Sequence, residues 1–335
     1  MDRRFRYLAA VAAIAAPVAI TLTLFAQSSD APPPSPWTGR TTAAGHPDFQ
    51  GHWTNDTFTP LERSEELGDK AVFTPEEAAA FFQSRVDDLH GQADDDIHYD
   101  DAIWQAENYT KVAHLRTSLI SEPKNGRLPA LTAHATEMLP KQRAAQRATS
   151  ADSADSRSLA ERCISWGNVG PPMVPPTYNA NLQILQSSDL VLIRHEMMHD
   201  ARLIYLDGRP HPPPSLQWLA GHSVGHFEGQ TLVVDTTNFT ALTNFRGSPG
   251  NSRQDIFASE RLHVVERFTR TGEEPIQYSF TVDDPDTWVS PWAGEMEMRS
   301  VDGPIYEYAC HEGNLGLANI LRAARVAEGQ ALHRD

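Results

Sequence analysis

The chain has 335 residues and is strongly acidic, because 44 Asp and Glu side chains outnumber 28 Lys and Arg side chains and give a formal net charge of −16 at pH 7. This charge argues against nucleic acid or an anionic membrane surface as a partner, since both repel an acidic protein. The sequence also contains no glycine-rich phosphate loop, haem motif or nucleotide-binding motif, so it predicts no organic cofactor.

The N-terminus has the layout of a signal peptide. Three arginines among the first six residues precede an apolar run over residues 7–26, and Ala26-Gln27-Ser28 offers small residues at the two positions that a signal peptidase reads. We therefore predict that residues 1–28 are removed on export, which takes away three positive charges and one negative charge and changes the net charge from −16 to −18. An uncleaved anchor is the alternative, because the run approaches the ~20 residues that span a bilayer. No later stretch is apolar enough to form a membrane span.

The next segments predict a tether followed by a helical part. Residues 29–46 are rich in proline and are expected to be extended, with no core of their own. Residues 47–158 contain two predicted helices, at 74–89 and 133–147. The first begins with a capping box, since Thr74 supplies the N-cap hydroxyl and Glu77 the carboxylate at the third helical position. We expect this part to pack against the domain that follows it.

The C-terminal domain, residues 159–335, has the pattern of a β-sheet. Short aliphatic and β-branched runs recur between turn residues, and they predict strands at 182–185, 190–194, 202–206, 224–227, 231–235, 261–269, 276–282, 295–299 and 305–308. Connections such as Ser187-Ser188-Asp189 and Asp207-Gly208 leave no room for crossover helices, so the strands should be antiparallel. The predicted fold is mainly β with a helical N-terminal part, closed as a lipocalin-like up-and-down antiparallel β-barrel or left open as a curved meander. A barrel of this strand number holds about one small ligand.

The sequence contains two cysteines, Cys163 and Cys310. Export to an oxidising compartment predicts that they form a disulfide, which would tie the middle of the chain to its end. A free catalytic thiol is the alternative, although nothing near Cys163 indicates a lowered thiol pKa.

One segment matches a known catalytic motif but lies in the wrong structural context. Residues His195 to His199 read His-Glu-Met-Met-His, the zinc-protease pattern, which requires a helix so that both imidazoles reach one metal. The flanking residues alternate as in a strand, on which the two histidines would lie about 13 Å apart, from a rise of ~3.3 Å per residue. On such a strand Asp200 and Arg202 share a face, and if that face turned into the barrel they would form an ion pair.

Three long segments and the start of the folded part carry a family resemblance. They are Pro47-Asp48-Phe49-Gln50-Gly51-His52-Trp53, residues 203–211, Phe227-Glu228-Gly229-Gln230-Thr231-Leu232-Val233-Val234-Asp235-Thr236-Thr237-Asn238-Phe239 and Tyr306-Glu307-Tyr308-Ala309-Cys310-His311-Glu312-Gly313-Asn314. Together they resemble a large family of exported bacterial proteins without an assigned activity. The resemblance implies a periplasmic or secreted bacterial protein. It also implies that Glu196, His199, Asp200 and Arg202 belong to a shared Glu-x-x-His-Asp-x-Arg pattern, whereas His195, His222 and His226 are particular to this chain.

The candidate site residues follow from this pattern and from residue chemistry. A histidine beside a carboxylate is the usual unit of acid–base catalysis, so we predict catalytic roles for His199 with Glu196 and for His311 with Glu312. The predicted ligand-binding residues are Arg202, Asp200, Trp218, Asn238 and Tyr308. No metal is predicted; if a divalent metal does bind, its ligands are expected among His195, His199, His222, His226 and His311.

Three functions remain open from the sequence. The leading one is an exported enzyme that uses histidine and carboxylate groups as general acid and base on a small or amphiphilic organic molecule, as a lyase, isomerase or hydrolase. The second is a metal-dependent hydrolase whose histidine ligands come from several strands. The third is a non-catalytic barrel that binds a ligand or scaffolds an envelope complex. The expected partner is a small molecule in each case except the scaffold.

Overall fold

The computed structural model describes residues 39–90, 115–166, 170–175, 179–242, 244–245 and 256–329. The predicted signal peptide and the first part of the predicted tether lie outside these residues. From Gly39 the chain makes a turn and then joins the sheet, with His46 stacked on Phe227 at a ring-centroid distance of 4.1 Å.

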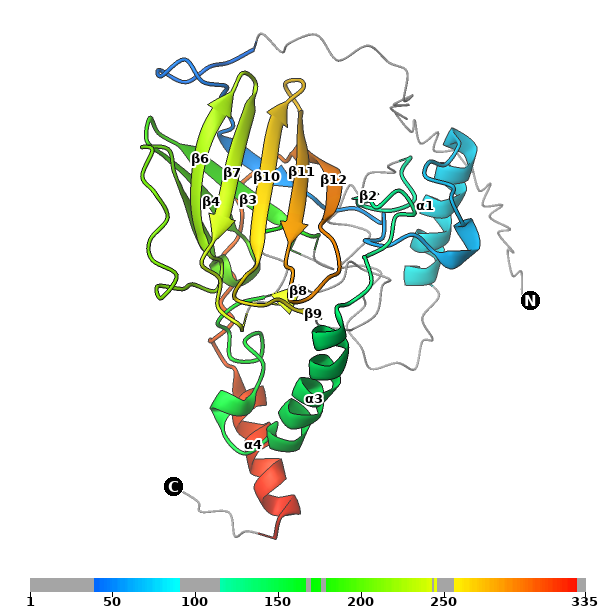
Figure 1. Cartoon of the computed structure of the whole chain (residues 1–335), viewed down its shortest axis with the longest axis vertical. Coiled ribbons are helices and arrows are strands. Elements are labelled where there is room, and N and C mark those ends of the chain that lie inside the picture. Colours follow the sequence, from blue (N-terminus) through cyan, green and yellow to red (C-terminus); the bar gives the residue numbers. More distant parts are fainter. Residues whose placement is uncertain are drawn as a thin grey trace, which may run out of the picture.

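Nine strands of the described chain close into a β-barrel (Figure 1). Their order around the barrel is β1 (Gly51–Thr54), β3 (Asn181–Gln186), β4 (Leu190–His195), β5 (Ala201–Tyr205), β6 (His222–Glu228), β7 (Thr231–Thr237), β10 (His263–Arg270), β11 (Pro275–Asp283) and β12 (Trp292–Ser300), and β12 pairs again with β1. A short β2 (Ile120–Glu122) lies against the other end of β12, and β8 (Asn244–Phe245) pairs with β9 (Ile256–Phe257). The predicted barrel is therefore confirmed.

Two details differ from the prediction. Strands β5 and β6 pair in parallel, through Ile204 opposite Ser223 and Tyr205 opposite Val224, because residues 206–221 form a long connection rather than a hairpin at Asp207-Gly208. The other pairings around the barrel are antiparallel. The predicted strand at 305–308 is wrong, since this segment has no strand partner, and β1 from the N-terminal part supplies the ninth strand instead.

The barrel interior holds the main core. Burial alternates along the strands, as in β4, where Val191, Ile193 and His195 point inward, and in β11, where Ile276, Tyr278, Phe280 and Val282 do so. Inward side chains from β1, β3, β4, β7, β10, β11 and β12 form one continuous hydrophobic cluster. The interior is thus occupied largely by the protein's own side chains.

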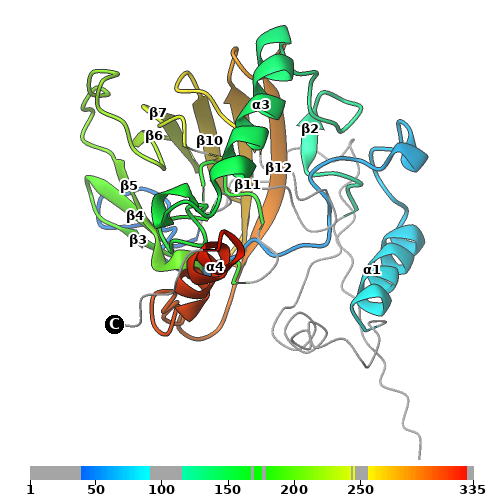
Figure 2. The same cartoon turned by 90° about the horizontal axis from the view of Figure 1, so that it is seen from below.

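Three α-helices of the described chain lie outside the barrel. Helix α1 (Pro75–His90) lies beside it, while α3 (Ala133–Thr149) and α4 (Leu315–Ala327) extend from one end (Figures 1 and 2). The predicted capping box is confirmed, because the Glu77 amide donates to the Thr74 hydroxyl (3.2 Å) and the Thr74 amide to the Glu77 carboxylate (2.8 Å). Single 3-10 turns occur at Glu65–Leu67, Ala154–Ser156 and Met197–His199. No helix within the described ranges combines the length and apolar character of a membrane span.

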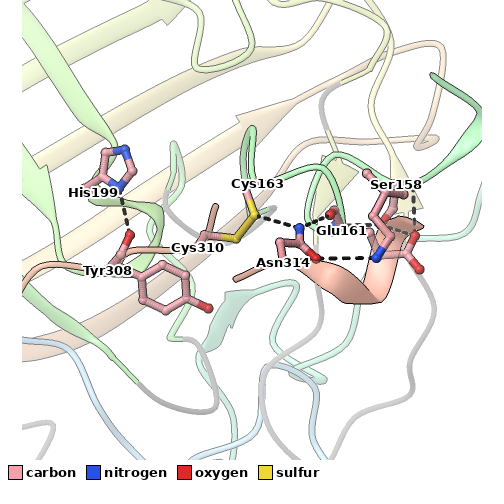
Figure 3. The surroundings of a disulfide bond; sticks show 8 residues. Ser158, Glu161, Cys163, His199, Tyr308, Cys310 and Asn314 are labelled. Atoms are coloured by element: carbon pink, nitrogen blue, oxygen red, sulfur yellow. Dashed lines mark hydrogen bonds between the residues drawn. A yellow bond between two sulfur atoms is a disulfide. The ribbon is translucent and has the colours of Figure 1, made fainter. Parts of the chain in front are cut away.

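The predicted disulfide between Cys163 and Cys310 is present, with the two Cα atoms 5.6 Å apart (Figure 3). It joins the loop after the Ala154–Ser156 turn to the segment that leads into α4. Asn314 strengthens this junction, since its amide donates to the Glu161 carbonyl (3.2 Å) and its side-chain oxygen caps α4 at Leu317. The C-terminal segment is thereby attached to the end of the barrel.

Loss of the disulfide should destabilise the protein, because the bond closes a loop of 147 residues in sequence and so restricts the unfolded chain. We expect a Cys163→Ser/Cys310→Ser variant to lose up to about 4–5 kcal/mol and to melt on the order of 10 °C lower than the wild type in differential scanning calorimetry. A reductant should lower the melting temperature of the wild type and leave that of the variant unchanged, since the chain has only these two cysteines. An unchanged melting temperature in the variant would contradict a structural role for the bond.

Candidate functional site

The His-Glu-x-x-His segment forms the tight connection between β4 and β5. His195 ends β4, Met197–His199 form the 3-10 turn, and Met198 and His199 adopt left-handed backbone angles, with φ of 58° and 44°. Met197 and Met198 are buried against Trp166, Tyr308 and Cys310, beneath the disulfide. The segment is therefore neither a helix nor one continuous strand, and the zinc-protease geometry is not formed.

The two histidines of this segment lie in different environments. His195 points into the barrel and is 7% exposed, whereas His199 is exposed on the turn and donates a hydrogen bond from Nδ1 to the Tyr308 carbonyl (3.0 Å; Figure 3). The expectation of a continuous strand through both histidines is thus wrong, because the 3-10 turn at Met197–His199 separates β4 from β5. Burial, together with the nearby Arg202 charge, lowers the pKa of His195 to about 3.

The buried His195 should make the protein sensitive to acid. Its folded-state pKa of about 3 lies below the value of about 6.5 expected in the unfolded chain, so below pH 6.5 the unfolded state gains a proton that the native state does not. We expect this side chain to contribute a loss of about 1.4 kcal/mol in the free energy of unfolding per pH unit as the pH falls from 6 to 4. Urea unfolding of a His195→Leu variant should show a correspondingly shallower pH dependence. His226→Leu serves as the control, because His226 is exposed. Parallel curves for the wild type and His195→Leu would contradict the assignment.

Arg202 and Glu266 form a buried ion pair inside the barrel. The Arg202 guanidinium meets the Glu266 carboxylate through both terminal nitrogens, with Nη1 to Oε1 at 3.1 Å, and both side chains are almost completely buried. Tyr278 donates its hydroxyl to the same carboxylate (2.8 Å) and accepts the Met173 amide (2.9 Å). Burial, followed by the Glu266 charge, raises the pKa of Tyr278 and keeps its hydroxyl protonated. The predicted Asp200–Arg202 pair is wrong, because Asp200 lies at the turn outside the barrel.

Breaking the Arg202–Glu266 pair from one side should be costly, since the other charge stays buried. We expect Arg202→Met to lower the free energy of unfolding by about 3–5 kcal/mol. A double Arg202→Met/Glu266→Leu variant should recover much of this loss, because it leaves no unpaired buried charge. Urea unfolding measures both, and a cost below about 1 kcal/mol for Arg202→Met would show that the pair is not the constraint inferred here.

A groove of about 510 Å³ lies on the outer wall of the barrel where β5 and β6 meet. The two strands pair through only two register positions, so residues 200–203 and 218–222 separate at one end and form its sides. Exposed apolar side chains line its rim, namely Ile164, Leu203 and Trp218. The polar side chains of its lining are Asp200, Arg202, Tyr205, His222 and Ser223. Burial raises the pKa of Asp200.

His222 lines this groove and is the first member of a series of hydrogen-bonded side chains. Its Nδ1 lies 3.0 Å from Nδ1 of His211, and Nε2 of His211 donates to Oδ1 of Asp235 (3.0 Å). His263 donates from Nε2 to the other oxygen of Asp235 (3.0 Å). The hydrogen bond between His263 and Asp235 lowers the pKa of Asp235 and raises that of His263, so both shifts favour the charged pair.

The chain of hydrogen bonds determines the tautomer of His222. Asp235 holds the His211 proton on Nε2, so a neutral His211 accepts at Nδ1 and His222 must donate from its own Nδ1. The lone pair of His222 is then on Nε2. Burial is the main cause that lowers the pKa of His222, and the charges of Arg209 and of His211, when His211 is protonated, lower it further; these effects keep His222 neutral. Tyr205 and Trp218 orient the ring, with centroids 5.4 and 5.8 Å from it.

Gly221 makes this position of His222 attainable. Its φ of +68° is left-handed, and an added Cβ would lie 2.7 Å from both the Thr236 methyl and the Thr237 carbonyl. A side chain at this position would push β6 away from β7 and move His222 out of register with Thr237.

The predicted site residues are only partly brought together. Asp200, Arg202 and Trp218 all line the groove. Glu196 instead holds the C-terminal segment, since its buried carboxylate accepts from Asn179 (2.7 Å), Asn181 (3.5 Å) and the Tyr306 amide (3.1 Å). His199 is exposed beside Asp200.

The remaining predicted residues lie outside the groove. The Asn238 amide donates to three carbonyls of the 206–221 connection, and the Tyr308 carbonyl accepts from His199. His311 and Glu312 are exposed in the turn that precedes α4. His226 pairs with Glu228 on the exposed side of β6 (3.1 Å).

Sequence reasoning missed His211, Asp235 and His263. One signal was available, because the hairpin at Glu228-Gly229-Gln230 pairs His222 with Thr237 and so makes Asp235 its diagonal neighbour. The contributions of His211 and His263 depend on long connections, whose course the sequence does not indicate.

The five histidines expected as metal ligands do not converge. His195 is inside the barrel, His222 is in the groove, and His199, His226 and His311 are exposed at separate places. Over the described ranges, no three His, Cys, Asp or Glu side chains are arranged so that they could hold a metal ion. Comparisons with known protein families, with curated proteins and with solved structures found no match to this chain.

Proposed function

We propose that the protein is an exported enzyme that carries out general acid–base chemistry on a small amphiphilic organic molecule, with His222 as the proton-transferring group. The observation that carries this proposal is the Asp235–His211–His222 hydrogen-bond chain ending in a groove. The expected chemistry agrees with the leading hypothesis from sequence, but it is assigned to different residues.

His222 has the properties of a general base. Its Nε2 carries the lone pair, and its lowered pKa leaves it unprotonated near neutral pH. When Nε2 takes up a proton, the Nδ1 proton stays hydrogen-bonded to His211, and the Asp235 carboxylate stabilises the added positive charge through His211. The same proton can then be returned to a leaving group or to another substrate atom.

The groove favours direct proton transfer or water activation over a covalent intermediate. The neighbouring hydroxyl, on Ser223, is buried and hydrogen-bonded to Thr236 (2.9 Å) across the strands rather than to His222. In a hydrolysis, His222 would remove a proton from water, the resulting hydroxide would add to the substrate carbonyl, and the proton would pass to the departing oxygen. In a lyase or isomerase reaction, His222 would remove a proton from carbon.

The groove lining supports an amphiphilic substrate. Ile164, Leu203 and Trp218 present apolar surface at the rim, whereas Asp200 and His222 are polar. Arg202 does not offer a free charge here, because Glu266 neutralises it.

Export is supported by the disulfide, since such bonds persist in oxidising compartments. We place the protein in the bacterial periplasm or outside the cell on this basis, together with the charged and apolar N-terminal sequence and the family resemblance.

Turnover assays on the purified protein test the proposal. The substrates are a series of p-nitrophenyl alkanoates for hydrolysis, and alkyl ketones whose α-deuterium exchange is followed by NMR for carbon deprotonation. We expect His222→Ala to lower kcat/KM by about 10²–10⁴-fold for whichever reaction the wild type catalyses. Because the pKa of His222 is lowered, the acidic limb of the wild-type profile should have its midpoint below pH 6.5.

His226→Ala is the matched control, because His226 lies on the same strand but is exposed and paired with Glu228. It should retain wild-type turnover, whereas Asp235→Asn should lose on the order of 10²-fold by disturbing the His211 tautomer. Equal turnover by the wild type and His222→Ala would refute the proposal. A wild type that binds these compounds and turns none over would point to the non-catalytic binding barrel.

A further inference from the structure

A row of leucines crosses the outside of the barrel next to the groove. Leu185 on β3 lies opposite Leu192 on β4, and Leu192 lies opposite Leu203 on β5. All three point away from the core, since their neighbours Ile184, Val191, Ile193, Arg202 and Ile204 are buried. Leu185 and Leu203 are 46% and 41% exposed. On a solvated face of a sheet these outward positions are ordinarily polar.

The row continues the groove without a break. Leu203 belongs both to the row and to the groove rim, where Ile164 and Trp218 add further exposed apolar surface. Adjacent strands lie about 4.8 Å apart, so the row extends on the order of 10 Å beyond the rim. Gln183 and Arg194 flank one side of this leucine track, and Leu190, opposite Tyr205, lies on the other side.

We propose that this track binds the alkyl chain of the substrate, so that the ligand is an amphiphile whose polar end reaches His222 and whose tail lies over Leu203, Leu192 and Leu185 in that order. This inference rests on the proposed function only in placing the polar end at His222.

The dimensions favour an alkyl chain over a protein partner. A specific protein interface buries about 800 Å² on each partner, whereas the track crosses only three strands and its two exposed leucines, Leu185 and Leu203, are less than half exposed. A flexible hydrocarbon chain needs only a narrow apolar strip. Its binding gains free energy with each methylene it removes from water.

Binding of p-nitrophenyl alkyl ethers of increasing chain length tests the track, because these compounds carry the same aromatic and alkyl groups as the esters and cannot be hydrolysed. Affinity measured by calorimetry below the critical micelle concentration should rise about 2- to 4-fold per methylene until the track is filled. In Leu192→Gln the affinity should stop rising at shorter chains than in Leu185→Gln, since Leu192 lies closer to the groove. The control is Leu242→Gln, an exposed leucine outside the row, which should follow the wild-type series.

The outcomes separate this inference from the proposed function. His222→Ala should keep the chain-length dependence of ether binding while losing turnover. If the wild type turns over no substrate, but ether affinity stops rising at shorter chains in the leucine variants, the alkyl-chain track is supported and the enzymatic function is refuted. The alkyl-chain track would be overturned if ether affinity depended on chain length in the same way in the wild type, Leu185→Gln and Leu192→Gln, with all three equally folded by circular dichroism. A change from dimer to monomer in Leu192→Gln by sedimentation would also overturn it, in favour of an interface between two copies.

Discussion

The short parallel contact between β5 and β6 is the constraint on which the candidate site depends. Antiparallel neighbours joined by tight hairpins pair along most of their length, as β6 and β7 do over seven register positions. Strands β5 and β6 instead come together through the long 206–221 connection and pair at two positions only. Their separated ends leave the groove. The connection that makes the parallel pairing feasible also brings Trp218 to the groove and His211 to His222.

The polar side chains on the inner and outer faces of the barrel wall near the groove differ in whether they are fully paired. Inside, Arg202, Glu266 and Tyr278 pair with one another, and His195 stays neutral because it is buried and lies near the Arg202 charge. Outside, His222 keeps a polar atom available to solvent while Asp235 acts on it through His211. A polar group that is fully paired stabilises the fold, whereas one that retains a free lone pair at a groove can take part in chemistry.

The C-terminal segment is attached to the β4–β5 turn and to the loop that carries Cys163 and Ile164. The Glu196 carboxylate accepts from the Tyr306 amide, and the His199 imidazole donates to the Tyr308 carbonyl. The disulfide then joins Cys310 to Cys163, the residue before Ile164. Met197 and Met198 fill the space beneath this junction. Glu196, His199 and the two methionines of the His-Glu-x-x-His segment therefore serve mainly to attach the C-terminal segment. The residues better arranged for proton transfer lie on β6, β7 and the connection before β6.

The sequence by itself determined the local structure and much of the barrel. The capping box at Thr74 and Glu77, the second helix, eight of the nine barrel strands and the pairing of Cys163 with Cys310 follow from short-range periodicity, turn residues and cysteine number. Only the tertiary structure decided how the barrel closes and where the candidate site lies. β1 and the parallel β5–β6 pairing join residues far apart in sequence, and no local pattern encodes such a register. Arg202 meets Glu266, and His211 meets Asp235 and His222, for the same reason: each partner is brought in by a long connection, whose path depends on packing across the whole barrel rather than on the residues within it.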